Sequence, residues 1–538
     1  MRGLAALAVV AGLLLGASPG GGSPAVAAPS AVAPGSGSAP ASRAVPVTPP
    51  AEFGTDWDDP RTAAPPVAHP AGPSCTVRIV DHQFTDFTPY TSQYTPPAEC
   101  AGPWRTVTLR LDGAVKGRQY DRLGALRIGG ATILKTSTPE PSADGIRWNA
   151  EKDVTEYQQL LSSPQPVWML LGNVVDGTYT GVLDIQVSLT FYPGRPRDRA
   201  ADVIPAGDGP VTLPRDSERI TADVYATGSG GGCEEFWYLA APPSTGYSCP
   251  AGDGPYREVQ VLVDGQVAGI AAPYPHIYTG GWSNPFLWYA QPAPRAFDVH
   301  PLRLDLTPFA ALLADGKPHA VTVRVEGVPA GQSGWDTPLN VLAWRDPSGR
   351  PVHGGLLAQS LSAPDHTSTV DGRTVDSAGT RRLTASGWLA TSHGRVVTTV
   401  SESLTSTSHH TWGEGENPDS LAATWTDTSA VAVLGAHPSV TRSAKKYTVD
   451  GSIAVDPQNR LTTTIALLDA ADDTTLGGAR LISTRSLRDE YRGEASWTLD
   501  VPRDQRHATG SSTEHYRLTG TDGHYDRTLT SQNGYFQP

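Results

Sequence analysis

From Leu183 to Phe191 the chain reads Leu-Asp-Ile-Gln-Val-Ser-Leu-Thr-Phe, with an apolar side chain at every second position. A period of two is typical of a β-strand that has one face in the core and the other in water. Residues 107–111 repeat this pattern, and Asp-Gly pairs such as Asp112-Gly113 favour tight turns. Short alternating strands, frequent turns and few helical segments together predict an all-β fold of antiparallel sandwiches.

Two segments far apart in the chain share one pattern. Residues 153–161 and 305–313 each read Asp, an aliphatic residue and Thr, followed by an aromatic residue and two leucines at matching positions. Thr307 suits a helix cap and Pro308 the first helical turn, so we expect one short helix in each copy. The repeat predicts two tandem jelly-roll-like β-sandwiches followed by a further β-rich C-terminal region. The expected boundaries are 72–195 and 215–330 for the sandwiches, 196–214 for the linker, and 335–538 for the C-terminal region.

The first residues predict export. Residues 4–15 form an apolar run that is shorter than the ~20 residues of a membrane span, and Ala25-Val26-Ala27-Ala28 offers a cleavage site. We therefore expect a signal peptide at 1–28, a secreted protein and no membrane anchor. Residues 29–71 are rich in Pro, Ala and Ser, which predicts a flexible leader.

The net charge and the cysteine content exclude some partners and favour disulfides over a metal site. A formal net charge of -13 opposes binding to a phosphate backbone, so we expect no nucleic-acid partner. The four cysteines fall into two local pairs without the spacing of a zinc site, so disulfides are favoured over a metal. We expect Cys75 to pair with Cys100 and Cys233 with Cys249, although four cysteines permit three connectivities.

Several charged segments lie beside aromatic residues. Residues 116–122 read Lys-Gly-Arg-Gln-Tyr-Asp-Arg before a strand, and residues 234–238 read Glu-Glu-Phe-Trp-Tyr. Rings stack on the apolar faces of sugars while carboxylates bind hydroxyl groups, so this mixture suits sugar recognition. Trp282, next to Gly280 and Gly281, is a candidate for an exposed platform. By composition alone, however, the charges of segment 116–122 are better explained as a structural ion-pair network.

At these segments the chain resembles the peptide N-glycosidase A family. The resemblance runs from about Cys75 to about Val328, and Glu234 and a Gly-rich insert at 228–232 depart from the pattern. The segments that carry it are 94–97 (Tyr-Thr-Pro-Pro), 103–104 (Pro-Trp), 116–122, 136–141 (Thr-Ser-Thr-Pro-Glu-Pro), 151–155 (Glu-Lys-Asp-Val-Thr), 180–182 (Thr-Gly-Val), 235–238, 254–258 (Gly-Pro-Tyr-Arg-Glu) and 278–281 (Tyr-Thr-Gly-Gly).

The resemblance implies an amidase that acts on N-glycopeptides or N-glycoproteins. It would hydrolyse the amide between the innermost GlcNAc and Asn, convert Asn to Asp, and use no cofactor and no metal. Such a reaction needs a carboxylate to activate water, a donor for the oxyanion and an acid for the leaving amine.

The types of the charged residues suggest which side chain would act at each step of this reaction. Asp121 is the first choice for activating water, and Arg118 or Arg122 for stabilising the oxyanion or keeping Asp121 ionised. Glu140 and Glu235 are the candidate acids, and a cleft between the two sandwiches would bring these groups together. The candidate substrate-binding residues are Trp237, Tyr256, Arg257, Glu258 and Trp282.

Two other functions remain open from the sequence. The same sandwiches suit a noncatalytic glycan-binding protein, which would need the aromatic residues but not the carboxylates. Two carboxylates also suit an endo-acting glycosidase that leaves one GlcNAc on Asn. Residues 335–538 carry no chemical signature, and the sequence indicates no oligomeric state.

Overall fold

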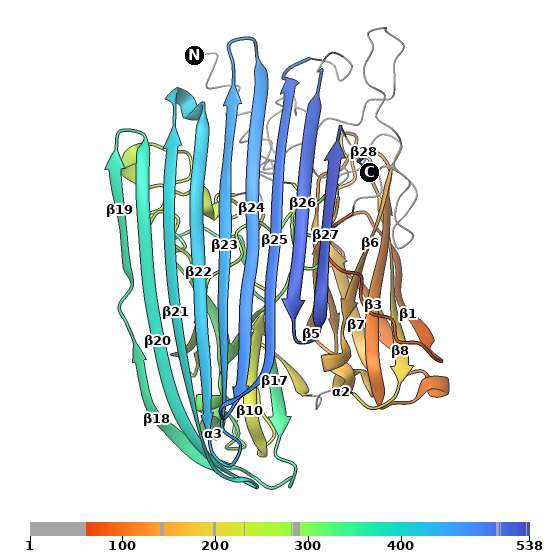
Figure 1. Ribbon diagram of the computed structural model, residues 1–538. Helices are drawn as coiled ribbons and strands as arrows, with labels where there is room; N and C mark the ends of the chain where they lie inside the picture. The colour runs from red at the N-terminus through yellow and green to blue at the C-terminus, as the bar shows by residue number, and fades with distance from the viewer. Residues whose placement is uncertain are drawn as a thin grey trace.

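The computed structural model of the chain describes residues 61–139, 145–196, 201–230, 232–280, 282, 291–501, 505, 507–533 and 535–537. The predicted signal peptide and most of the predicted leader lie outside these residues. Within them, no helix is long and apolar enough to cross a membrane. Three β-rich parts follow one another along the chain, as Figure 1 shows by colour, and the predicted all-β fold is confirmed.

The first sandwich consists of two four-stranded antiparallel sheets. The alternating stretch that begins at Leu183 lies in a central strand, where its apolar side chains are buried and its polar ones are not. The inner faces of both sheets supply one hydrophobic core. One sheet has the order β1 (Cys75–Phe84), β8 (Leu183–Pro193), β3 (Trp104–Val115) and β6 (Ile146–Asp153), and the other β2 (Tyr90–Tyr94), β7 (Gln165–Leu171), β4 (Leu123–Ile128) and β5 (Ala131–Ser137).

The second sandwich combines a four-stranded and a three-stranded sheet. The first has the order β14 (Leu302–Asp305), β10 (Ser217–Val224), β17 (Leu339–Arg345) and β9 (Asp202–Ala206), and the second β13 (Gln266–Ala271), β12 (Glu258–Val263) and β15 (Val321–Glu326). The short strands β11 (Thr227–Gly228) and β16 (Trp335–Asp336) pair beside them. This sandwich therefore extends beyond the expected 215–330, since β9 lies in the expected linker and β17 follows the expected end.

The repeated pattern folds as a short helix in both copies. A 3-10 turn, η2 (Thr155–Tyr157), continues into α2 (Gln158–Leu161) in the first sandwich. The second copy forms η6 (Thr307–Phe309) and α3 (Ala310–Leu313). The aromatic residue of each pattern, Tyr157 or Phe309, is buried, which explains the shared spacing.

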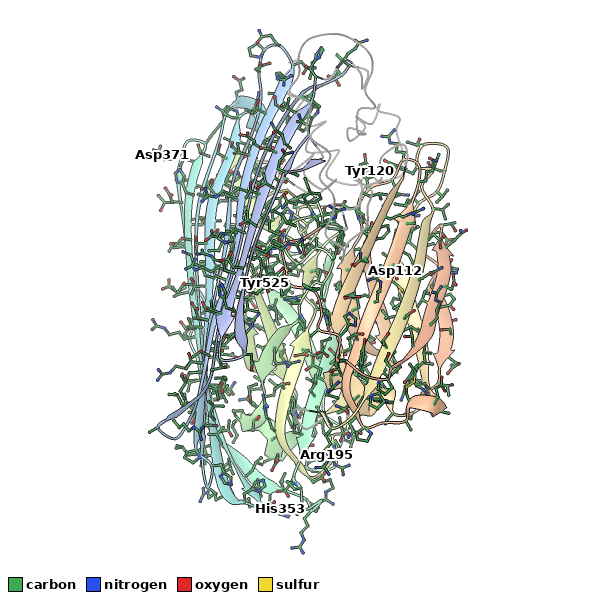
Figure 2. The ribbon with its side chains drawn as sticks, turned by 45° about the vertical axis from the view of Figure 1, so that its right-hand side comes forward. Asp112, Tyr120, Arg195, His353, Asp371 and Tyr525 are labelled. Atoms are coloured by element: carbon green, nitrogen blue, oxygen red, sulfur yellow. A yellow bond between two sulfur atoms is a disulfide. The ribbon has the colours of Figure 1, made fainter. Side chains whose placement is uncertain are left out.

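The C-terminal part is one large antiparallel sheet. Its long strands stand beside both sandwiches (Figure 1), and in Figure 2 the second sandwich lies between this sheet and the first sandwich. The strands follow the order β18 (His353–Leu361), β20 (Thr374–Thr391), β21 (Gly394–Trp412), β22 (Asp419–Leu434), β23 (Ser439–Val455), β24 (Arg460–Gly477), β25 (Arg480–Thr498), β26 (Thr509–Gly520), β27 (Gly523–Gln532) and β28 (Tyr535–Phe536), with β19 (Asp365–Asp371) paired to β20.

The inner face of this sheet completes the core that supports the loops of the second sandwich. Buried residues from 236–293 and from 375–499 belong to one hydrophobic cluster. Buried carboxylates extend the contact, because Glu402 accepts a hydrogen bond of 2.7 Å from the Ile270 amide and Arg295 binds Asp469 at 2.5 and 2.6 Å. The C-terminal region is thus packed against the loops that follow β11 and β13.

Candidate active site between the two sandwiches

The Asp121 carboxylate lies where the two sandwiches meet. Asp121 belongs to the connection between β3 and β4 of the first sandwich, whereas Thr279 and Gly280 follow β13 of the second. The Gly280 amide donates a hydrogen bond of 3.1 Å to Oδ2 of Asp121, and the Thr279 hydroxyl lies 3.2 Å from the same oxygen. The carboxylate is therefore held by both sandwiches.

Burial raises the pKa of Asp121 above its ordinary value, because a charged carboxylate loses hydration there. The hydrogen bonds from Gly280 and Thr279 and the charge of Arg122 act in the opposite direction and only partly offset the burial. A raised pKa brings a carboxylate closer to the working pH of a general base. Asp121 thus has the environment of a proton acceptor.

The Arg122 guanidinium is held by a neighbouring glutamine. Nε and Nη2 of Arg122 donate to Oε1 of Gln119 at 3.1 and 2.5 Å. The Gln119 amide group in turn donates to the carbonyls of Val174 and Gly181, both at 3.0 Å. Because the glutamine side chain is only 4% exposed, the cation is held next to Asp121 by a rigid support.

Arg118 is placed differently. Its guanidinium carbon lies 5.5 Å from the centre of the Tyr179 ring, and its backbone amide donates to the Thr180 hydroxyl at 3.2 Å. Its Nη2 is buried without a hydrogen-bond partner among the described residues. The charge of Arg122 thus acts on Asp121, whereas the contacts shown for Arg118 are with Tyr179 and Thr180.

The Tyr278 phenol is affected by the charges of two predicted carboxylates. Burial raises the pKa of the Tyr278 phenol well above its ordinary value, and the charges of Glu235 and Asp121 raise it further. The charges of both carboxylates therefore act on the same phenol. Among the predicted residues, Arg122 thus acts electrostatically on Asp121, and Asp121 and Glu235 both act on Tyr278, whereas Glu140 lies outside the described residues.

Three residues of this site were missed by sequence reasoning. In the sequence, residues 278–281 carry part of the family resemblance and precede Trp282, but the sequence alone indicated no role for Tyr278, Thr279 or Gly280. The only hint in the sequence was the pair Gly280-Gly281, because glycine lets a backbone amide approach a ligand or a carboxylate closely. Nothing local indicated that the partner of Thr279 would be Asp121, which is 158 residues away.

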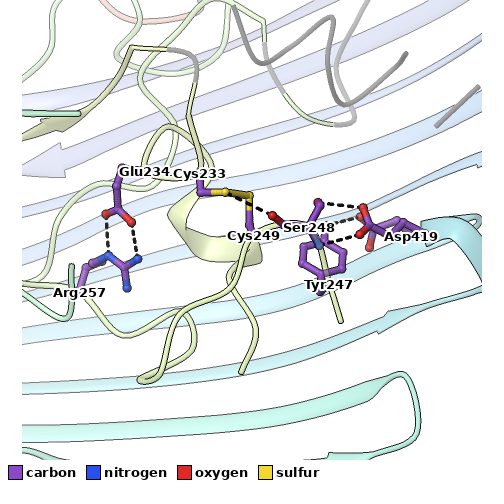
Figure 3. The surroundings of a disulfide bond; sticks show 8 residues. Cys233, Glu234, Tyr247, Ser248, Cys249, Arg257 and Asp419 are labelled. Atoms are coloured by element: carbon purple, nitrogen blue, oxygen red, sulfur yellow. Dashed lines mark hydrogen bonds and ion pairs between the residues drawn. A yellow bond between two sulfur atoms is a disulfide. The ribbon is translucent and has the colours of Figure 1, made fainter. Parts of the chain in front are cut away.

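Arg257 forms a buried ion pair with Glu234 (Figure 3). Its Nε and Nη2 donate to the two carboxylate oxygens at 2.8 and 2.6 Å, and the Trp335 indole donates to Oε2 of Glu234 at 2.6 Å. The Arg257 side chain is 0% exposed. The expected direct contact of Arg257 with substrate does not match this placement, because its guanidinium supports the segment that carries Glu235.

The other expected substrate contacts are also buried. The Tyr256 hydroxyl donates to Glu258, which is 0% exposed and also accepts from Gln260 at 2.7 Å. Trp237 packs against Tyr238, Trp335 and Trp425. Trp282 is 5% exposed and is not the expected platform. All four residues are buried in the described structure.

The two disulfides match the expected pairs. Cys75 and Cys100 are joined with a Cα separation of 6.1 Å, and Cys233 and Cys249 with a separation of 5.3 Å. Cys233 of the second bond directly precedes Glu234 (Figure 3), and Glu235 is the next residue in the sequence. This bond closes a 16-residue separation and so restricts the loop that carries the candidate acid.

Two further features lie apart from Asp121. A cavity of about 1170 Å³ between the first sandwich and the C-terminal sheet is lined by Asp112, Glu151 and Glu514 among others, but not by Asp121. One group with metal-ligating side chains in the described part of the chain is Glu218, Asp346 and His393, whose ligand atoms lie within 4.8 Å of one another. His393 already contacts Glu218 at 2.9 Å, and neither feature contributes to the site.

This architecture defines an all-β protein with a carboxylate site between two sandwiches. A family model described as Peptide N-acetyl-beta-D-glucosaminyl asparaginase amidase A matches residues 60–341, just over half of the chain. The chain belongs to this family.

Individual relatives and solved structures differ in their sequence identity to this chain and in the length over which they match it. Peptide-N4-(N-acetyl-beta-glucosaminyl)asparagine amidase A from Prunus dulcis is 30% identical over 382 residues, which is 62% of this chain and 66% of the relative, just under two thirds. Among solved structures, PNGase F, a glycosylasparaginase from Flavobacterium meningosepticum, is 14% identical with a TM-score of 0.34 over 51% of this chain and 96% of that one. PNGF-II is 16% identical with a TM-score of 0.35 over 51% and 66%.

Proposed function

We propose that this protein is a secreted peptide N-glycosidase that hydrolyses the amide between the innermost GlcNAc and Asn of N-glycopeptides or N-glycoproteins. Family membership supports the reaction class, as does the name of the Prunus dulcis relative, an amidase acting on N-acetyl-β-glucosaminyl asparagine. The expected signal peptide and the two disulfides support secretion, because disulfides persist in oxidising compartments.

The observation that carries the proposal is the Asp121 carboxylate at the junction of the two sandwiches. Asp121 takes a proton from water, and the water oxygen forms a bond to the side-chain carbonyl carbon of the glycosylated Asn. The Arg122 guanidinium stabilises the oxyanion that forms, since a fixed cation beside developing charge lowers the barrier. The support of Arg122 by Gln119 is consistent with this role.

Collapse of the tetrahedral intermediate breaks the bond between carbon and nitrogen. Glu235 supplies the proton to the departing glycosylamine, with Glu140 as the other candidate acid. The peptide keeps Asp, and the released glycosylamine then loses ammonia in water. The electrostatic effect of both Glu235 and Asp121 on the Tyr278 phenol is consistent with a division of acid and base roles between the two carboxylates.

The decisive experiment is turnover of a defined N-glycopeptide in heavy-oxygen water, read by mass spectrometry. We expect Asp carrying one heavy oxygen. Asn that retains one GlcNAc would indicate a glycosidase, and an unchanged glycopeptide at several pH values would favour a noncatalytic glycan-binding protein.

A matched pair of variants tests the role of Asp121. Asp121→Asn is expected to lower kcat by about 10²- to 10⁴-fold while retaining glycopeptide binding, because it removes the general base. The control is Asp112→Asn, whose side chain on β3 is 52% exposed and is expected to leave turnover unchanged. Full activity in the Asp121 variant would contradict the assignment.

A further inference from the structure

Thr279 is a buried residue of the second sandwich that reaches across to the first. Its side chain is 0% exposed, and its hydroxyl lies 3.2 Å from Oδ2 of Asp121 and 3.0 Å from the Thr138 carbonyl. A buried hydroxyl of this kind holds its partners through hydrogen bonds, because no water is at hand to replace those bonds if the hydroxyl is removed. The position of this one oxygen therefore depends on both sandwiches.

The surroundings hold the Thr279 hydroxyl in place. The Thr138 amide donates to the Arg122 carbonyl at 2.9 Å, and the Arg122 amide donates to the Thr138 hydroxyl at 2.9 Å. Thr138 is thus tied to the segment that carries Asp121. The Thr279 carbonyl accepts a hydrogen bond of 3.2 Å from Ala293, which anchors the other side of the contact.

The Gly280 amide completes the arrangement. It donates to the same Oδ2 at 3.1 Å, so two donors on consecutive residues converge on one carboxylate oxygen. Two fixed donors restrict rotation of a carboxylate about its terminal bond and favour its charged form. Among the described residues, the charge of Arg122 on the same segment acts on Asp121, and the charges of Asp121 and Glu235 act on the Tyr278 phenol of the facing loop.

We propose that Thr279 is a positioning residue, which together with the Gly280 amide holds the Asp121 carboxylate in the orientation for activating water. This inference rests on the proposed amidase function. In this arrangement a residue of the second sandwich orients the general base, Asp121, which belongs to the first sandwich. Turnover therefore requires that the two sandwiches pack against each other correctly. A threonine hydroxyl is suited to this task because its β-branched side chain has few rotamers.

The test compares Thr279→Val, which keeps the shape and removes the hydroxyl, with Thr279→Ser, which restores the hydroxyl. We expect Thr279→Val to lower kcat by about 10-fold or more with KM within about 2-fold, since the hydroxyl contacts to the Asp121 carboxylate and to the Thr138 carbonyl are lost while the shape of the side chain is kept. The acid limb of the kcat/KM profile should move up by about one pH unit, because the charged form of Asp121 loses a donor. Thr279→Ser should return both quantities to near the parent values.

The matched control is Thr221→Val in β10, where the hydroxyl is buried without a hydrogen-bond partner among the described residues. This variant should leave kcat and the acid limb unchanged. If Thr279→Val behaves like the parent protein, or if Thr279→Ser is as impaired as Thr279→Val, the hydroxyl has no positioning role. Thermal unfolding of each variant separates this result from a failure to fold.

A second measurement does not depend on turnover. Infrared difference spectra recorded across pH, with Asp121→Asn as the reference, follow the protonation of the Asp121 carboxyl directly. The titration midpoint should be higher in Thr279→Val than in the parent, and equal midpoints would overturn the inference. Absence of any turnover by the parent protein, by contrast, would refute the proposed function and leave this readout to decide the role of Thr279.

Discussion

Glu234 and Arg257 form a bidentate ion pair in the interior, with contacts of 2.6 and 2.8 Å and exposed fractions of 1% and 0%. The pair anchors the backbone one residue before Glu235. It also lies beside the Cys233–Cys249 disulfide, so a covalent bond and an ion pair restrain the same loop. This segment of the second sandwich is therefore held by one disulfide and one buried ion pair.

Replacing Arg257 tests the contribution of this pair. Arg257→Met should lower the free energy of unfolding by roughly 3–5 kcal/mol, because Glu234 remains as a buried charge without its partner. The control is Arg78→Met, since Arg78 and Asp81 form a pair that is 50% and 61% exposed and whose loss should cost less than about 1 kcal/mol. Urea unfolding of both variants provides the comparison, and equal midpoints would contradict the structural role of Arg257.

Glu235 is expected to act in the reaction rather than in folding. Glu235→Gln should lower kcat by about 10²- to 10⁴-fold with little change in the unfolding midpoint, because the amide keeps the shape of the side chain but cannot supply the proton. Glu326→Gln, on β15 and 36% exposed, is the matched control. Steady-state kinetics with a labelled glycopeptide give the measurement, and parent-like turnover would exclude Glu235 as the acid.

A pair of carboxyl groups in the C-terminal sheet predicts a pH-dependent stability. Burial raises the pKa of Glu514 to about 7, and burial next to Glu514 raises the pKa of Asp489 well above its ordinary value. Asp469, Arg295 and Arg527 supply the surrounding charges. A raised carboxyl pKa stabilises the fold below the unfolded value of about 4, and this contribution is lost as pH rises through about 7.

We therefore expect the thermal midpoint to fall as pH rises from 6 to 8. Glu514→Gln should reduce this dependence, because an amide accepts the Ala63 hydrogen bond, donates to Asp489 and does not ionise. The matched control is Glu490→Gln on β25, where the side chain is 37% exposed. If the midpoint of the parent protein is flat over this range, the two carboxyl groups do not share a proton.

Gly228 provides a steric test of the loop that carries Glu235. A Cβ atom at this position would lie 2.0 Å from the Glu234 carbonyl oxygen, a backbone atom that cannot move without its neighbours. Gly228→Ala should thus displace the Glu234–Glu235 segment and lower both kcat and the unfolding midpoint. Gly209→Ala, where a Cβ meets nothing within 4 Å, should change neither. Parent-like activity of Gly228→Ala would show that the loop position is not critical.

Some predictions of substrate-binding residues were based on residue type alone, and the positions of these residues in the structure do not match them. Arg257 and Glu258 were expected to bind substrate because charged residues beside aromatic rings suit sugars. Arg257 is instead paired with Glu234 in the interior. Glu258 is also buried, where it accepts a hydrogen bond from the Tyr256 hydroxyl and lies 3.5 Å from the Arg381 guanidinium. A charged residue that is buried with a charged partner looks the same in the sequence as a charged residue exposed to substrate. Composition therefore cannot distinguish a structural ion pair from a substrate-binding residue.

The sequence by itself determined what depends on neighbours in the chain. Alternation determined the strands, as in β8, the repeated spacing determined the helices α2 and α3, and short separations favoured the two disulfide pairs. Only the tertiary structure decided that Asp121 meets Thr279, and that β17 completes the second sandwich. Such contacts join residues more than a hundred positions apart. They depend on how whole sheets pack, and no local pattern encodes that packing.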